Sequence, residues 1–373
     1  MKADAKNALG QHLIIGLRGP ALEADEIDFI VRNNIGGVIL FARNCLSPPQ
    51  VHALCSEVQA LRGRMPDKAP LWIGVDNEGG RVARLKPPFT QWPAPAELGK
   101  VDSTSVAFKF AAQMGEELRA VGINVCFAPS ADVLTNPNNP AIGDRSFGPD
   151  PELVARMASA VVRGFMKSDV LPCVKHFPGH GNTAVDSHFT LPVETRTLIE
   201  LRARELVPFK KTLHARLDLV MTAHILFPNV DPVWPASLSP VFAGLLREEL
   251  RFRGLIVTDD LGMKALADRW SVANVAVQAM KAGADLLLYC NEPEAPGIAL
   301  EALRKALSEK SLDASLLKTS LQRIFTLKRA KLIKPDPLPF EQTSEAIGHA
   351  DHSRLAQAIA SGSVSEELAP RNN

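Results

Sequence analysis

Residues 175–188 hold the side chains best suited to acid/base chemistry. The stretch follows a short apolar run and contains three histidines and one carboxylate but almost nothing to bury, so a rigid scaffold must hold it. Asp186 and His188 stand two positions apart at its end. A carboxylate bonded to one imidazole nitrogen fixes the tautomer and raises the basicity of the other nitrogen. The spacing predicts an acid/base pair on a loop, although an ordinary polar loop is the alternative.

A further carboxylate stands where a nucleophile could be held firmly. Asp259 directly follows the apolar run 255–258, so it would extend from the end of a rigid strand. Its neighbour Asp260 would face another direction and cap the helix that starts near Leu261. The alternative is that both aspartates cap helices. We predict Asp259 as a catalytic residue.

Asp76 and Arg84 could bind a polar ligand near a double glycine. Asp76 can accept hydrogen bonds from ligand hydroxyls or from the amides of the Gly79-Gly80 turn. Arg81 and Arg84 carry planar guanidinium groups suited to polar ligands. The segment therefore predicts a ligand-binding turn.

Three more side chains could complete the binding set. Arg145 could clamp a ligand or pair with the adjacent Asp144. Lys175 and His176 emerge together from the end of an apolar run, where they could donate to ligand hydroxyls. The alternative for Lys175 and His176 is an ion pair with a carboxylate such as Asp132.

The histidines also allow a metal hypothesis. His176, His180 and His188, with Asp186, are ligand types for a catalytic zinc. Pro178 and two glycines prevent the helix that would place the first two histidines on one face. We expect no metal and no other cofactor.

Short apolar runs alternate with longer amphipathic segments along the chain, and the runs are almost continuously aliphatic, as in a parallel sheet covered on both faces. The predicted strands cover residues 12–17, 37–41, 71–76, 123–128, 171–176, 219–223, 255–258 and 285–289. The predicted helices cover residues 23–33, 49–61, 105–121, 151–167, 199–215, 239–249, 271–282 and 296–307. Eight such units predict an α/β fold, a (β/α)8 TIM-type barrel. A doubly wound sheet is the alternative, but no GxGxxG motif follows any run.

The barrel hypothesis predicts where the chemistry lies, because active sites of such barrels lie at the carboxyl ends of the strands. Asp76, Asp132, Lys175, His224 and Asp259 stand at or just after five successive strand ends. This arrangement favours a catalytic barrel.

The chain after the eighth unit is short. Residues 313–332 read as a helix, three prolines then interrupt the chain, and residues 344–360 form a short helical patch before a polar tail. We predict a single catalytic barrel over residues 1–332 and a C-terminal extension over residues 333–373, with no second folded domain.

Composition limits the partners and the compartment. The 373 residues are 46% hydrophobic and 22% charged, with a formal net charge of +1, so nothing favours nucleic acid as a partner. Five widely spread cysteines fit free thiols in a reducing compartment. The apolar run 13–17 is too short for a signal sequence or a membrane span, so we expect a soluble cytoplasmic protein.

Together these residues resemble glycoside hydrolase family 3, in particular its single-domain bacterial β-N-acetylglucosaminidases. The segments that carry the resemblance are 36–41, 76–84, 122–124 with 128–129, 144–147, 175–188 and 258–261. The Lys-His-Phe-Pro-Gly-His-Gly element, closed by Asp-Ser-His, is the most specific of them.

The resemblance implies a role for each site residue. Asp259 corresponds to the nucleophile that forms a covalent glycosyl-enzyme, and His188, oriented by Asp186, to the acid/base. The residues that correspond to the sugar-binding set are Asp76, Arg84, Arg145, Lys175 and His176. Since no second domain is expected, a loop of the barrel itself must supply the acid.

The implied function is removal of terminal N-acetylglucosamine from muropeptides, small carbohydrate substrates, during cell-wall recycling. Action on another β-linked sugar such as glucose, phosphorolysis, and sugar binding without turnover are the alternatives. The oligomeric state stays open. The chain departs from the family pattern at Asn77, Asn182 and Gly262, none of which is a proposed catalytic group; glycine at 262 could loosen the turn beside Asp259.

Overall fold

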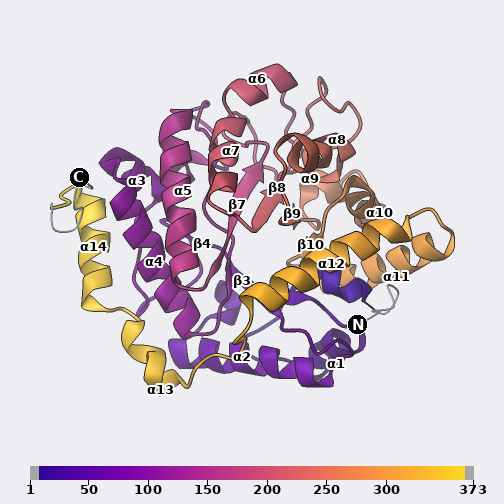
Figure 1. The fold of residues 1–373 in the computed structure, drawn as a ribbon, viewed down its shortest axis with the longest axis horizontal. Helices are drawn as coiled ribbons and strands as arrows, with labels where there is room; N and C mark the ends of the chain where they lie inside the picture. The colour runs from indigo at the N-terminus through magenta and orange to yellow at the C-terminus, as the bar shows by residue number, and fades with distance from the viewer. Residues whose placement is uncertain (1–7, 366–373) are drawn as a thin grey trace.

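The computed structural model describes residues 8–365 and shows a closed barrel of eight parallel strands (Figure 1). Around the barrel the strands follow the order β1-β10-β9-β8-β7-β6-β3-β2. They are β1 (Leu13–Gly16), β2 (Gly37–Leu40), β3 (Trp72–Val75), β6 (Val125–Cys126), β7 (Leu171–Phe177), β8 (Leu219–Thr222), β9 (Leu255–Asp260) and β10 (Leu286–Tyr289). The predicted (β/α)8 fold is confirmed, and each predicted strand contains an observed one or overlaps it.

Helices cover the outside of the barrel, most of them within two residues of the predicted bounds. These are α1 (Ala24–Arg32), α2 (Pro48–Ala60), α4 (Thr104–Ala120), α5 (Pro151–Lys167), α10 (Val272–Ala282) and α11 (Ala295–Ser308). Local signals explain their starts: Asp150 accepts hydrogen bonds from the amides of Glu152 and Leu153, and Pro151 occupies the first turn of α5.

Two predicted helices differ from the observed ones. Residues 199–215 form two helices, α6 (Leu198–Ala203) and α7 (Leu206–His214), because Pro208 has no N–H and fits only the first turn of a new helix. Residues 239–249 begin as α8 (Pro240–Gly244) and continue as a π-helical turn.

The connections contain several short elements that were not predicted from the sequence. They are the antiparallel hairpin β4 (Asn77–Gly79) and β5 (Val82–Ala83), and the helices α3 (Pro95–Val101), α9 (Lys264–Ala267) and α13 (Phe340–Thr343). Helices of four to seven residues have too few turns for a periodic pattern to identify them.

Two apolar cores hold the fold together. One lies between the barrel and its helices, and the other fills the barrel with side chains such as Trp72 and Phe127. Gly74 makes room for this filling, since a Cβ there would lie 2.6 Å from the Phe127 ring. The barrel is therefore a packed core and not a pore.

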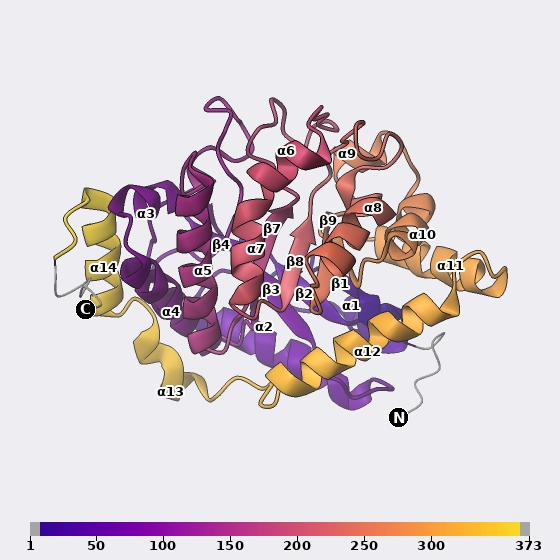
Figure 2. The same ribbon diagram turned by 45° about the horizontal axis from the view of Figure 1, so that its top comes forward.

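Helix α12 (Ala314–Lys331) closes the amino-terminal end of the barrel, on the side opposite the long connecting loops (Figure 2). Its Ile324 belongs to the core inside the barrel. The buried Lys328 donates to Gln11 Oε1 and to the carbonyl of Gly36, each at 2.8 Å, and lies over the Trp72 ring. Burial lowers the pKa of Lys328 to about 7.

After α12 the chain runs along the outside of the barrel to α14 (Ala350–Ser361), which lies against α3 and α4 (Figures 1 and 2). The buried Glu117 of α4 accepts hydrogen bonds from Thr90 and from the amide of Gly348. Helix α14 begins six residues later than predicted. The ends of the two predicted domain ranges, residues 1–7 and 366–373, lie outside the described residues. Among residues 8–365 no helix is both long and apolar enough to cross a membrane.

Candidate active site

A cavity of about 460 Å³ opens at the carboxyl ends of the strands. The apolar part of its wall includes Phe41, Met221 and Met263. All eight predicted site residues line it: Asp76, Arg84, Arg145, Lys175, His176, Asp186, His188 and Asp259. The structure thus brings together side chains that lie up to 183 positions apart in the sequence, from Asp76 to Asp259.

Strand β7 places two consecutive side chains at the cavity. Its pairing with β8 shifts register between Val174 and Phe177, and such an irregularity re-aims side chains. As a result Lys175 and His176 both line the cavity, although neighbours on a regular strand point to opposite faces.

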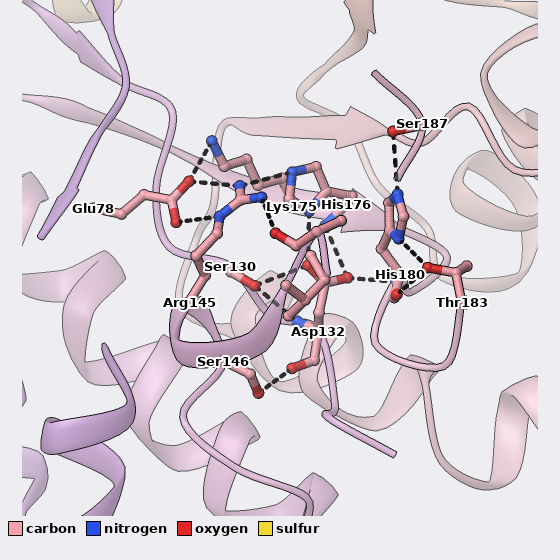
Figure 3. Close-up of polar contacts among 12 residues, drawn as sticks. Glu78, Ser130, Asp132, Arg145, Ser146, Lys175, His176, His180, Thr183 and Ser187 are labelled. Carbon is pink, nitrogen blue, oxygen red and sulfur yellow. Dashed lines mark hydrogen bonds and ion pairs between the residues drawn. The ribbon is translucent and has the colours of Figure 1, made fainter. Parts of the chain in front are cut away.

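Lys175 and Arg145 are locked in a buried charge cluster (Figure 3). Lys175 Nζ lies 2.7 Å from Asp76 Oδ1 and 2.7 Å from Glu78 Oε1. Arg145 binds both oxygens of Glu78, at 2.8 and 2.9 Å. Burial opposes ionisation of Glu78, but Arg145 and Lys175 outweigh it and hold the pKa of this carboxyl well below its usual range. The cluster therefore presents two fixed cations and the partly exposed Asp76 to a ligand.

The role of Glu78 was not predicted from the sequence. It stands two residues after Asp76, and side chains at positions i and i+2 of an extended segment share a face. This spacing of two residues was the sequence feature that could have placed Glu78 beside Asp76. The predicted alternative partner of Arg145, Asp144, pairs instead with Arg81 at 2.8 Å.

His176 is held by Asp132. Its Nδ1 lies 2.7 Å from Asp132 Oδ2, while Arg145 Nη2 lies 3.1 Å from its Nε2. A guanidinium can only donate, so Nε2 accepts and Nδ1 carries the proton that goes to Asp132. The ion-pair alternative thus named the right carboxylate for His176, whereas Lys175 pairs with Asp76 and Glu78.

Arg84 retains hydrogen-bonding capacity toward the cavity. Its Nη2 lies 3.8 Å from Asp76 Oδ2, and its guanidinium lies over the Phe41 ring. Its Nε is buried and has no hydrogen-bond partner among the described residues.

Asp259 stands at the end of β9. Its Oδ1 accepts a hydrogen bond from the amide of Asp260 at 2.8 Å. Burial raises the pKa of Asp259, but the nearby His224 and His176 outweigh burial and lower it to about 2. The carboxylate is therefore ionised at neutral pH, as a nucleophile requires.

Asp260 does not cap a helix in the predicted way. Its Oδ1 accepts from the amides of Gly262 and Cys290, at 3.0 and 3.1 Å, while α9 starts only at Lys264, after Met263. The side chain instead ties the end of β9 to the chain after β10. Burial raises the pKa of Asp260 despite these bonds.

Asp186 and His188 do touch. Asp186 Oδ1 lies 2.8 Å from His188 Nδ1 and accepts the amide of His188 at 2.9 Å. Burial opposes ionisation of Asp186, but the bonds to His188 outweigh it and lower the pKa of Asp186. The His188 side chain is 64% exposed, so its ring can reach solvent and ligand alike.

The remaining histidine of the loop faces inward. His180 is 2% exposed and binds Thr183 and Ser187 through its two ring nitrogens. Over residues 8–365, no three histidine, cysteine, aspartate or glutamate side chains are grouped so that they could hold a metal ion.

Comparison with known proteins places this barrel in a family. The model of the glycosyl hydrolase family 3 N-terminal domain matches residues 7–327. The chain belongs to glycoside hydrolase family 3. As a family 3 member it is a glycosidase.

Individual members of family 3 agree with this assignment. A β-hexosaminidase of Methylococcus capsulatus is 43% identical over 77% of this chain and 85% of its own length. The structure of a family 3 β-N-acetylglucosaminidase from Paenibacillus has a TM-score of 0.89 at 38% identity, over 97% of this chain and 69% of that one. NagZ from Neisseria gonorrhoeae, solved with N-trifluoroacetyl-D-glucosamine, has a TM-score of 0.76 at 30% identity, over 95% and 98% of the chains.

Two of the three departures from the family 3 pattern, Asn77 and Asn182, serve structural roles through their side chains. Asn77 accepts the amide of Arg84 at 3.2 Å, and Gly262 donates its amide to Asp260. Asn182 bridges Thr135 and Glu194 at 2.9 and 2.5 Å. The side chains of Asn77 and Asn182 therefore support the cavity and its loop, whereas the Gly262 bond uses only the backbone and does not depend on glycine.

Proposed function

We propose that this chain is a retaining exo-β-N-acetylglucosaminidase that acts through a covalent glycosyl-enzyme. The observation that supports it is a rigid, ionised carboxylate, Asp259, lining one small cavity together with a touching carboxylate–imidazole pair, Asp186 and His188. A nucleophile and a separate acid/base group are the two parts that a double displacement needs.

In the first step Asp259 attacks the anomeric carbon. A C–O bond to the enzyme forms while the bond to the leaving oxygen breaks. His188 Nε2 gives its proton to that oxygen, and Asp186 at Nδ1 stabilises and orients the ring.

In the second step the roles of His188 reverse. The now neutral ring removes a proton from a water molecule, whose oxygen attacks the anomeric carbon and releases Asp259. Two inversions at one carbon retain the β configuration. Most retaining glycosidases use a second carboxylate as the acid, and here the imidazole takes that place.

The substrate class follows from the cavity and the relatives. A cavity of about 460 Å³ is at the small end of ligand pockets, which suits one terminal sugar ring. Asp76, Arg84, Arg145, Lys175 and His176 would bind its hydroxyl groups. The relatives named β-hexosaminidase and β-N-acetylglucosaminidase support N-acetylglucosamine as that sugar.

We further propose that the physiological substrates are muropeptides in the cytoplasm, met during cell-wall recycling. The five free cysteines, four of them buried, support a reducing compartment.

The test is hydrolysis of a chromogenic N-acetyl-β-glucosaminide beside the matching β-glucoside, each with and without phosphate. We expect preference for the N-acetyl substrate and no effect of phosphate. Preference for the glucoside would overturn the substrate, and phosphate-dependent release would indicate a phosphorylase. Absence of activity on both would favour a sugar-binding barrel without turnover.

A further inference from the structure

The loop that carries the acid/base pair makes one described side-chain hydrogen bond to the rest of the barrel. We call residues 184–190 the acid/base loop. Their other described hydrogen bonds stay inside the loop, as in the bonds from His188, Phe189 and Thr190 to Asp186. The one that leaves it joins Ser187 Oγ to His180 Nε2 at 3.2 Å (Figure 3).

His180 is itself firmly held. Its amide donates to Asp132 Oδ1 at 2.6 Å, and its carbonyl accepts from Asn139 Nδ2 at 2.7 Å. Its ring packs edge-on against the His176 ring, with 5.8 Å between centroids. The buried Asp132 thus holds the sugar-binding His176 and the anchor of the acid/base loop at the same time.

The hydrogen bonds around Thr183 determine which nitrogen of His180 is protonated. Thr183 Oγ1 lies 3.1 Å from the carbonyl of His180 and 2.7 Å from His180 Nδ1. A carbonyl can only accept, so the single hydroxyl proton of Thr183 goes to it. His180 Nδ1 must then donate to Thr183 Oγ1, which leaves Nε2 as the acceptor of the Ser187 hydroxyl.

Burial, together with the neighbouring His176, lowers the pKa of His180 to about 4. The ring therefore stays neutral at physiological pH, and Nε2 keeps its lone pair for Ser187.

We infer that His180 is a positioning residue: by accepting the Ser187 hydroxyl at Nε2, it fixes the acid/base loop over the cavity. Ser187 stands between Asp186 and His188, so its anchoring orients both neighbours. The inference rests on the proposed function, because it takes these two residues as the acid/base pair.

Loss of the tie should impair acid catalysis and little else. The Asp186–His188 bond is local to the loop and would survive, but the placement of His188 relative to Asp259 would not. Asp259 and the cluster of Glu78, Lys175 and Arg145 make no described hydrogen bond to His180.

Two substitutions at position 180 separate the two ring contacts. In His180→Gln the amide reaches the place of Nε2, where its oxygen can accept from Ser187. In His180→Asn the amide reaches only the place of Nδ1, so it can donate to Thr183 but leaves Ser187 unpaired. Ser187→Ala removes the same hydrogen bond from the loop side without leaving a large cavity. It replaces the variants at position 180 as the test if one of them does not fold.

The readout compares a 4-methoxyphenyl with a 2,4-dinitrophenyl N-acetyl-β-glucosaminide, because only the first needs a proton to leave. We expect His180→Asn and Ser187→Ala to lower kcat/KM about 10- to 100-fold on the methoxyphenyl substrate and less than about 3-fold on the dinitrophenyl one. His180→Gln should restore most of the loss. In a His188→Ala background, His180→Asn should cost nothing more, since both changes remove one function.

Equal losses on the two substrates, or unchanged kinetics in both His180→Asn and Ser187→Ala, would overturn the inference. His188→Ala alone tests the proposed function. If it slows both substrates equally, the acid assignment fails and the inference fails with it. If it is selective while the position-180 variants are not, only the positioning role is wrong.

Discussion

Asp259 combines a rigid strand end with an ionised carboxylate. One oxygen accepts the amide of Asp260, and residues 8–365 provide no described hydrogen bond to the other. In the proposed mechanism this leaves one oxygen to attack, with its direction set by β9.

Replacing this carboxylate should abolish turnover without unfolding the protein. We expect Asp259→Ala to lower kcat at least about 10⁴-fold on N-acetyl-β-glucosaminides, because the variant has no group to form the covalent intermediate. Steady-state kinetics beside a thermal melt measure both quantities. Activity within tenfold of the parent would show that another group is the nucleophile.

The low pKa of Asp259 makes a prediction about acid conditions. A lowered pKa means that the ionised form persists as the pH falls and is lost only near pH 2. On a dinitrophenyl substrate, which needs no acid, the rate of glycosyl-enzyme formation should therefore stay within about twofold from pH 7 to pH 4.

Pre-steady-state bursts measure this rate, and far-UV circular dichroism checks the fold at each pH. A tenfold fall per pH unit starting near pH 5 would mean that the nucleophile titrates there.

The position of a single site residue was predictable where a reactive side chain directly follows an apolar run, as Asp259 does. Glu78 was not assigned a role, Asp132 was named only as an alternative ion-pair partner, and His180 only as a possible metal ligand, because each acts through partners more than 40 positions away or through a local turn. Only the tertiary structure brings those partners together.

The connections between elements position the proposed acid/base pair, Asp186 and His188. Asn182, which precedes the acid/base loop, donates from Nδ2 to Glu194 Oε2 at 2.5 Å and accepts from Thr135. Glu194 is buried and Asn182 is half-buried, so an amide suits this position better than a second carboxylate would.

Asn182→Asp should weaken this connection by about 1–3 kcal/mol, since the donor to the buried Glu194 is replaced by a like charge. Adding Glu194→Gln should recover most of the loss, because the amide is then supplied from the other side. Chemical denaturation of the two single variants and the double variant measures the coupling. Purely additive effects would show that the two side chains do not interact.

Among the secondary-structure elements, the apolar runs identified all eight strands of the barrel, and the residues at the ends of these runs indicated where the cavity lies. The periodic pattern could not show that Pro208 divides one helix into two, nor that the chain between Asn77 and Ala83 forms a hairpin. Those outcomes depend on local backbone chemistry that periodicity does not contain.

The C-terminal extension supports the barrel from outside. Leu355 of α14 is 1% exposed, and its helix lies against α3 and α4. Helix α3 in turn packs closely on the chain around Arg145, since a Cβ on Gly99 would collide with the carbonyl of Phe147.

Leu355→Ala should cost about 2–5 kcal/mol of unfolding free energy, as for other buried leucines. Below the melting transition kcat/KM should stay within about twofold, because none of residues 333–365, the described part of the extension, lines the cavity. Leu338→Ala is the matched control, since Leu338 is 59% exposed and should lose less than about 0.5 kcal/mol. Equal destabilisation by the two changes would contradict the packing described for α14.

The barrel can close only after its last strand has been synthesised. Strand β1 pairs with β10. Lys328 of α12, at the amino-terminal end of the barrel, binds Gln11, which precedes β1. A ribosome that adds about 5–20 residues per second needs roughly 15 to 55 s to pass from Gly16 to Leu286. During that time the backbone N–H and C=O groups along one edge of β1 lack their partners in β10, and its side chains are apolar, which is the condition that invites association between nascent chains. The yield of folded enzyme should therefore depend on how well a cell shields its first strand until the last one arrives.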